Sequence, residues 1–329
     1  MIGRVKAKLY AYFFWQTNIG EYLNKIYDLK IFLSNSFRTD KLQTKENYIA
    51  FLTKQYHIIE KGLALPNPRQ NFGKPKIILL IEKANEYVKQ YGSDRLIDGI
   101  KETLTSYLER NINLEKEENE LFVLIQNFVS TNSASNNIGG LKKLDKDYIN
   151  NIASFDFDSF VKSRTSVRNF SDEEVLIDEI YQAVEMARYA PSVCNRQSWK
   201  VHFYSDDKVK KELLKLQNGN NGFTDSINKV LLITTDTKKF TKLESNQVFV
   251  DGGLFSMNLL LSLHSLGIAS CCLNTCLPYV DEKKMKMVGE IPTSERLIMM
   301  IGIGKYKDSF EVAISDRIQP KDIVETKHK

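Results

Sequence analysis

Apolar residues recur at steps of three and four positions through the first part of the chain, from Glu21 to about Val129. The run Leu96, Ile97, Ile100, Leu104 and Leu108 is a clear case. Because this spacing is that of amphipathic helices, the region is predicted to be mostly helical. Its one irregular stretch, residues 57–74, contains two Pro and two Gly. This stretch is expected to connect two helices, either as a plain link or as a loop that carries function.

Helical and strand-like patterns alternate in the second part of the chain. The predicted strands are Lys200–Tyr204, Lys229–Thr235, Ala269–Asn274 and Arg296–Ile303, and the helices between them lie near 206–217, 245–266 and 281–288. A further helix is expected to begin at Ser171, because Ser171 to Glu174 has the spacing of a capping box, and to end before Pro191. This half is therefore predicted to be an α/β or α+β domain.

Small polar residues over 130–140 separate the two patterns and have the composition of a flexible connection. The charge balance also changes there: residues 1–150 hold 22 Lys and Arg against 17 Asp and Glu, and residues 151–329 hold 24 against 24. We therefore predict a helical domain at 1–150 and a second domain at 151–329. The net charge of +5 is too dilute to favour nucleic-acid binding, but phosphate groups on a small ligand remain open.

Three features bear on location. The four cysteines all follow residue 190 and lack the even spacing of a secreted disulfide protein. The start, Met1 to Trp15, places basic residues before an apolar run that is too short for a signal peptide. A helix docked on another domain is expected there, with a membrane-surface helix as the alternative. The longest apolar stretch, Leu254–Leu273, is interrupted by polar residues and indicates burial and no membrane span. A cytoplasmic location is predicted.

The segment Ser163–Phe170 carries the first candidate chemistry. Arg164, Ser166 and Arg168 occupy alternate positions, so an extended backbone points two guanidinium groups and a hydroxyl in one direction. Such a face suits a phosphate, and the helix predicted just beyond it adds partial positive charge. The alternative is a solvated loop with two surface arginines.

A second motif, Ala190–Trp199, places polar side chains in a loop between a helix and a strand, where they either line a ligand site or bond their own backbone. Together the two motifs resemble the nitroreductase family of FMN-dependent oxidoreductases. Downstream, Gly219–Phe223 is similar to the family's Gly-Asn loop, and 251–274 to its long apolar helix and the strand after it. Ile301–Gly304 is similar to the last core strand, and Ser315–Arg317 to the basic pair over the phosphate.

The resemblance implies an α+β fold, with a central, mostly antiparallel sheet flanked by helices, and a homodimer with FMN at its interface. It implies NAD(P)H as co-substrate and ping-pong hydride transfer through flavin N5 to an electrophilic small-molecule acceptor: a nitro compound, a quinone or a biosynthetic intermediate. A flavin-binding dehydrogenase or oxidase, or a non-catalytic flavin-binding module in a surface-polysaccharide assembly, is the alternative. The polysaccharide link rests on Ile59–Leu63 and Arg69–Gly73, which resemble the helical half of longer nitroreductase-like proteins.

The resemblance also assigns site residues. The backbone N–H of Asn274 would point at flavin N5, and Arg168 would lie beside the pyrimidine ring and stabilise the reduced flavin. Arg164, Ser166 and Arg317 would hold the phosphate. Asn220 would bond the pyrimidine edge, and the loop with Ser192 and Asn195 would come from the neighbouring subunit. The full set expected around the cofactor is Arg164, Thr165, Ser166, Arg168, Pro191, Ser192, Asn195, Asn220, Cys272, Leu273, Asn274, Ser315 and Arg317.

Other patterns are given ordinary structural interpretations. Cys271 and Cys272 on a strand would point to opposite faces, which disfavours a metal site with Cys276 and His264, and no metal is expected. The glycines at the end of the last predicted strand lack the third glycine and the helix start of a dinucleotide fingerprint. The acidic run 115–120 is predicted to be a solvated helix face.

Overall fold

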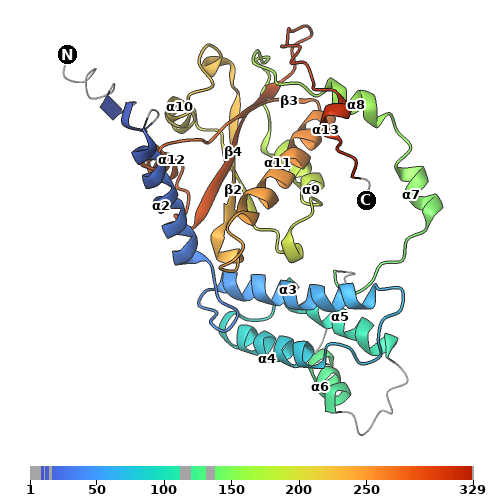
Figure 1. The fold of residues 1–329 in the computed structure, drawn as a ribbon. Coiled ribbons are helices and arrows are strands. Elements are labelled where there is room, and N and C mark those ends of the chain that lie inside the picture. The colour runs from blue at the N-terminus through green and yellow to red at the C-terminus, as the bar shows by residue number, and fades with distance from the viewer. Residues whose placement is uncertain (1–8, 11, 15–16, 112–119, 131–137, 328–329) are drawn as a thin grey trace.

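The computed structural model describes residues 9–10, 12–14, 17–111, 120–130 and 138–327 (Figure 1). The basic start of the chain up to residue 8, the acidic run from 115 to 119 and most of the small polar connection lie outside the described residues. In the part of the chain that is described, no helix combines the length and the apolar character needed to cross a membrane.

Four helices of the first half form a body with its own core (Figure 1). They are α3 (Lys45–Leu63), α4 (Lys74–Tyr91), α5 (Arg95–Arg110) and α6 (Glu120–Val129). Side chains at the predicted helical spacing, such as Ile97, Ile100 and Leu104, are fully buried in that core, so the helical pattern is confirmed. The expected irregular stretch at 57–74 is wrong in its first half: α3 continues to Leu63, and the loop covers only 64–73.

The second half is built on a four-stranded antiparallel sheet in the order β1-β2-β4-β3. The strands are β1 (Trp199–Tyr204), β2 (Lys229–Asp236), β3 (Ile268–Leu273) and β4 (Glu295–Lys305), close to the predicted runs. β3 pairs only with residues 300–305 of the longer β4. The first half of β4 therefore extends beyond the edge strand.

Helices cover both faces of this sheet. On one face α9 (Ile177–Ala187) and α11 (Gln247–Ser265) pack against side chains such as Leu231 and Ile301. On the other face α10 (Asp207–Leu216) and α12 (Tyr279–Val288) pack against their neighbours in the strands. Cys271 belongs to the second core and Cys272 to the first, so the two thiols do lie on opposite faces. The α+β fold, with a helical region before an antiparallel sheet, is confirmed.

The helix predicted to begin at Ser171 begins instead at Ile177. The backbone N–H groups before it are used elsewhere: that of Ser171 donates to the Lys305 carbonyl, and that of Val175 donates to the Asn228 side chain. Phe170 and Val175, on either side of this stretch, are buried in the sheet's two cores. The capping-box pattern was therefore overridden by contacts with residues far along the chain.

Short elements complete the chain. These are α7 (Lys146–Ile152), α8 (Phe157–Ser163), α13 (Pro320–Ile323), and the 3-10 turns η1 (Val193–Asn195), η2 (Thr224–Ser226) and η3 (Thr237–Lys239). α7 spans residue 150, close to the predicted boundary, and the division into two domains stays a prediction. Residues 311–327 are exposed throughout and form a tail that runs from the sheet past α8 (Figure 1).

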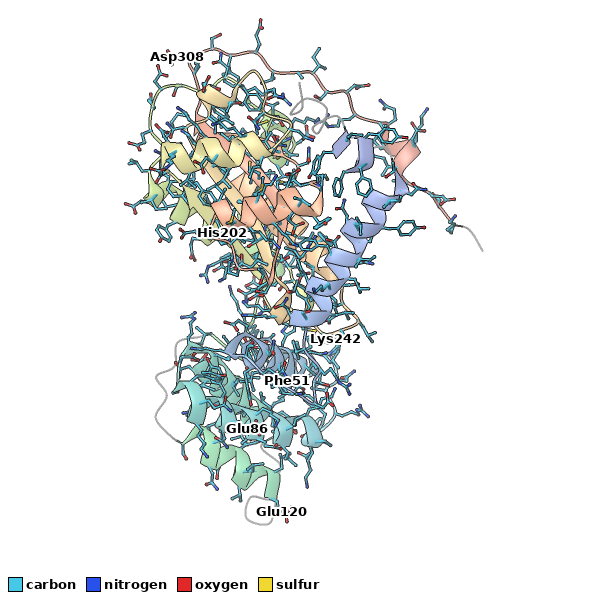
Figure 2. All side chains as sticks on the ribbon, turned by 90° about the vertical axis from the view of Figure 1, so that its left-hand side faces the viewer. Phe51, Glu86, Glu120, His202, Lys242 and Asp308 are labelled. Carbon is cyan, nitrogen blue, oxygen red and sulfur yellow. The ribbon has the colours of Figure 1, made fainter. Side chains whose placement is uncertain are left out.

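One helix of the first half lies apart from the helical body. α2 (Asn18–Asn35) packs along the sheet-containing half, where its Phe32 is buried against Phe240 and Val248. In Figure 2 it runs beside the upper, sheet-containing part, while the helical body with Phe51 lies below. The body is joined to the sheet half at η3, where Asn47 donates to the Lys238 carbonyl at 2.7 Å.

Candidate functional site

The segment that carries Arg164, Ser166 and Arg168 is extended and lies beside the edge strand β3. The Val167 N–H donates to the Ser270 carbonyl at 2.9 Å, and Val167 itself is fully buried. Arg164, Thr165 and Ser166 are half-buried, and Arg168 is exposed. Val167 is thus buried between the half-buried Ser166 and the exposed Arg168, and the common direction of the Arg164, Ser166 and Arg168 side chains stays a prediction. The expected support from a helix start just beyond is lost, because α9 begins at Ile177.

Arg164 is the half-buried cation of this segment. Among the described residues it makes no ion pair and no hydrogen bond. Its charge and, more strongly, burial lower the pKa of His264. That imidazole lies between two hydroxyls, with Nε2 2.8 Å from Ser163 Oγ and Nδ1 2.9 Å from Tyr306 Oη. A half-buried guanidinium without a carboxylate fits an anionic ligand such as a phosphate.

Asn274 is the exposed residue immediately after β3. Its side-chain oxygen accepts the Cys276 N–H at 3.1 Å, and its carbonyl accepts from Gln217 Nε2 at 3.2 Å. Its own backbone N–H has no partner among the described residues. Leu273 before it is buried, and burial raises the pKa of the half-buried Cys272 thiol. An unpaired N–H in a held loop is available to a ligand acceptor.

The side chain of the predicted site residue Asn220 is hydrogen-bonded within its own loop. It is 2 % exposed, and its amide nitrogen donates to the Leu214 and Gln217 carbonyls at 2.8 and 2.9 Å. Its oxygen accepts from Thr224 Oγ1 at 2.6 Å. The amide therefore shapes the turn in this structure and leaves no free donor. Gln217, which the sequence did not single out, is the residue that connects this loop to Asn274.

The loop from Pro191 to Ser198 is held by bonds within itself. Ser192 Oγ accepts the Gln197 N–H, and Gln197 Nε2 donates to Asn195, as in the self-bonded alternative. Cys194, Asn195 and Gln197 have φ values of 50°, 55° and 47°, a left-handed conformation that is costly for residues other than glycine. Strained backbone of this kind is concentrated at functional sites.

This loop and Arg164 lie at opposite ends of the sheet. The loop leads into Trp199, which aligns through Thr235 with Arg296 at the start of β4. Arg164 is close to Tyr306, which follows the other end of β4. An 11-residue strand spans roughly 35 Å. One chain therefore does not bring Ser192 and Asn195 to Arg164.

The last two predicted residues, Ser315 and Arg317, lie in the exposed tail. The Arg317 guanidinium donates to the Ser315 carbonyl, and Ser315 has a φ of 50°. Among the described residues, neither has a hydrogen bond to the segment around Arg164. Within the described residues no group of three or more metal-ligating side chains is present.

Part of the chain is similar to known proteins. Residues 161–305 match the model of the nitroreductase family. An Archaeoglobus fulgidus protein named as an NADH dehydrogenase/NAD(P)H nitroreductase is 25% identical over 172 residues, which are 50% of this chain and 93% of that protein.

Solved structures with a similar fold include an FMN-dependent nitroreductase from Clostridium difficile, with 21% identity and a TM-score of 0.46 over 53% of this chain and 100% of that one. A nitroreductase family protein from Streptococcus pneumoniae has 24% identity and a TM-score of 0.44 over 52% and 100%. These likenesses concern the fold alone. The match to the family model is confined to residues 161–305, and it identifies a nitroreductase family domain over that range.

Proposed function

We propose that the protein is an FMN-dependent oxidoreductase that takes hydride from NAD(P)H and passes it to an electrophilic acceptor in a ping-pong reaction. The family match and the relative named as an NAD(P)H nitroreductase support flavin-dependent oxidoreductase chemistry in general. The observation that carries the proposal is the half-buried Arg164 without a carboxylate partner beside β3, combined with the unpaired N–H of Asn274 after the same strand. These two features fit the phosphate and the ring of FMN.

Residues of the 163–168 segment and of the end of β3 would hold the cofactor. Arg164 would bind the phosphate with Thr165 and Ser166, while Arg168 would place a positive charge beside the pyrimidine ring. Cys272 and Leu273 would form part of the wall, and the Asn274 N–H would donate a hydrogen bond toward N5. When bound, FMN accepts and donates the hydride, so no side-chain nucleophile is needed.

A homodimer would complete this site. Ser192 and Asn195 lie at the far end of the sheet from Arg164 within one chain, so a second copy is the natural source of these two groups. Apolar side chains are left exposed where such a copy would pack: Tyr181 and Tyr189 beside α9 are 69% and 76% exposed, and Ile314 in the tail is 96% exposed. Exposed apolar surface of this kind is typical of an interface. The cytoplasmic location and the polysaccharide link stay predictions.

An anaerobic titration tests the function. The visible spectrum of the full chain with FMN is recorded, and NADPH and NADH are then added separately. Bound flavin that bleaches supports the oxidoreductase and identifies the donor. Bound flavin that stays oxidised favours the alternative, an oxidase or a flavin-binding module, and absence of bound flavin refutes the proposal.

A further inference from the structure

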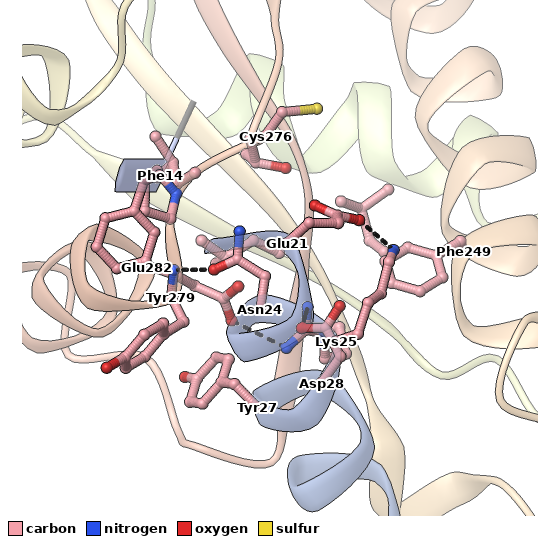
Figure 3. Close-up of a pocket in the computed structure, with 16 residues that line it drawn as sticks. Phe14, Glu21, Asn24, Lys25, Tyr27, Asp28, Phe249, Cys276, Tyr279 and Glu282 are labelled. Carbon is pink, nitrogen blue, oxygen red and sulfur yellow. Dashed lines mark hydrogen bonds and ion pairs between the residues drawn. The ribbon is translucent and has the colours of Figure 1, made fainter. Parts of the chain in front are cut away.

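A cavity of about 420 Å³ lies between α2, the start of α11 and the loop that follows β3 (Figure 3). One wall is formed by residues 275–279, which directly follow Asn274. The opposite wall is formed by α2, including Asn24, Tyr27 and Asp28. These α2 residues lie outside the part of the chain that matches the family model, which begins at residue 161. The cavity is thus lined both by the domain that matches the family model and by α2, which belongs to the first half of the chain.

The α2 wall is anchored to the domain by hydrogen bonds and a buried ion pair. Asn24 Oδ1 accepts the backbone N–H of Tyr279 at 2.8 Å (Figure 3). Asp28 pairs with Arg296 at 2.6 Å, and Arg296, which is 7% exposed, also pairs with Glu282 at 3.1 Å. Partner groups about 250 residues apart in the chain are thereby held at fixed distances. The α2 wall is therefore held in a fixed position against the domain.

The charged groups of the cavity are paired with one another, but several hydrogen-bond donors of its lining have no partner among the described residues. Lys25 pairs with Glu21 at 3.5 Å, and Asp28 and Glu282 both pair with Arg296. In contrast, the Asn24 amide nitrogen, the Thr275 hydroxyl and the buried Nε of Arg296 have no hydrogen-bond partner among the described residues. Aromatic rings supply much of the remaining lining: Phe14, Tyr27, Phe249 and Tyr279. Free donors between aromatic rings favour an uncharged planar ligand whose oxygens accept hydrogen bonds.

We propose that this cavity binds the electron acceptor, that the acceptor is an uncharged quinone, and that Asn24 donates a hydrogen bond to one of its carbonyl oxygens. This inference rests on the proposed function, because it places the acceptor next to the Asn274 N–H that would face flavin N5. The cavity volume lies in the range of small-molecule sites. Hydride transfer requires the acceptor to contact the flavin, and Asn274 is followed directly in the chain by Thr275 and Cys276, which line the cavity. α2 therefore determines acceptor specificity from outside the family domain.

Asn24→Asp is the decisive variant, because it keeps an oxygen that accepts the Tyr279 N–H and replaces the free N–H donors with a carboxylate oxygen. Thr275→Val removes the second donor without changing the side-chain shape. Asn18→Asp is the matched control: it adds the same charge to the exposed first turn of the same helix, away from the cavity lining.

The kinetic experiment uses the full chain loaded with FMN and duroquinone, a quinone whose ring is fully substituted and does not add thiols. Loss of one hydrogen bond is expected to raise the KM for duroquinone about ten-fold in Asn24→Asp, and less in Thr275→Val. FMN affinity and the rate of flavin bleaching by NAD(P)H are expected to stay unchanged in both. The Asn18→Asp control is expected to match the wild type.

A second readout needs no electron transfer. Cys276 is an exposed free thiol that lines the cavity. Duroquinone is expected to slow alkylation of Cys276 by iodoacetamide, measured on the peptide that contains Cys276. The protection is expected to weaken in Asn24→Asp.

Absence of Cys276 protection in the wild type would overturn the inference, as would an unchanged duroquinone KM in both cavity variants, even if the flavin is bound and reduced. Protection of Cys276 without any FMN binding would instead refute the proposed function and uphold the cavity as a quinone site.

Discussion

Replacement of Arg164 by Ala tests the phosphate site most directly. The Arg164 side chain is half-buried and has no hydrogen bond or ion pair among the described residues, so its removal breaks no internal bond of the chain. Its loss is expected to weaken the binding of FMN, which carries a phosphate, and to leave riboflavin, which has no phosphate, bound as before. The difference between the two ligands isolates the charge interaction from any general effect on the ring site.

The size of the effect follows from the type of bond. A hydrogen bond to a charged group contributes about 1.5–3 kcal/mol. At about 1.4 kcal/mol for each factor of ten, the Kd for FMN should rise about 10-fold to 150-fold. His264 and its two hydroxyl partners stay in place and continue to line the site, so complete loss of binding is not expected.

The assay is a fluorescence titration of each flavin with the wild-type chain and the variant. Arg38→Ala is the matched control, because Arg38 is an exposed arginine that pairs with Asp40 in a distant loop. It should leave both affinities unchanged. Equal weakening of FMN and riboflavin by Arg164→Ala, or no weakening of either, would refute the assignment of Arg164 to the phosphate.

Three further predictions concern stability, measured by denaturant unfolding of the flavin-free chain. Burial and the charge of Arg164 lower the pKa of His264, so the unfolded chain binds a proton at this imidazole more readily than the folded chain. The free energy of unfolding should therefore fall as the pH drops below about 6.5, and His264→Gln should reduce this loss. Arg296→Met leaves the Asp28 carboxylate without its buried partner and Glu282 with Lys286 alone, and it should cost about 3–5 kcal/mol at neutral pH. Gly304→Ala places a Cβ 2.6 Å from Phe170 and should cost about 1–3 kcal/mol through overpacking.

Each stability prediction has its own contrary result. An unchanged acid dependence in His264→Gln would contradict the role of His264. For the ion-pair network, Lys25→Met removes an exposed pair and should cost little, so equal losses in Lys25→Met and Arg296→Met would contradict the role of burial. Gly253→Ala, whose added Cβ meets no atom within 4 Å, should be tolerated; a larger loss there than at Gly304 would contradict the packing argument.

Local pattern was sufficient for most of the secondary structure. Helices of the first half, the four strands and the helices between them follow from spacing that each segment carries in itself, as in Ile97, Ile100 and Leu104. The extended segment with Arg164 and the separation of Cys271 from Cys272 also follow from the two-residue period of a strand. Such features depend on neighbours within a few residues, so they can be predicted from the sequence alone.

Features that depend on distant partners were decided by the tertiary structure. The start of α9 moved to Ile177 because the N–H groups before it bond the end of β4 and the Asn228 side chain. The Asn220 amide is used up by its own turn. No local signal connects Ser163 to His264, 101 residues later, or Asn24 to Tyr279, 255 residues later.

The sequence by itself therefore determined which segments are helices and strands and which family the second half resembles. The tertiary structure decided that α2 packs against that half and closes a cavity there, and that the loop with Ser192 lies at the far end of the sheet from Arg164. The physical reason is that periodicity records only which face of an element is buried. The identity of the surface that covers that face is set by the packing of the whole chain.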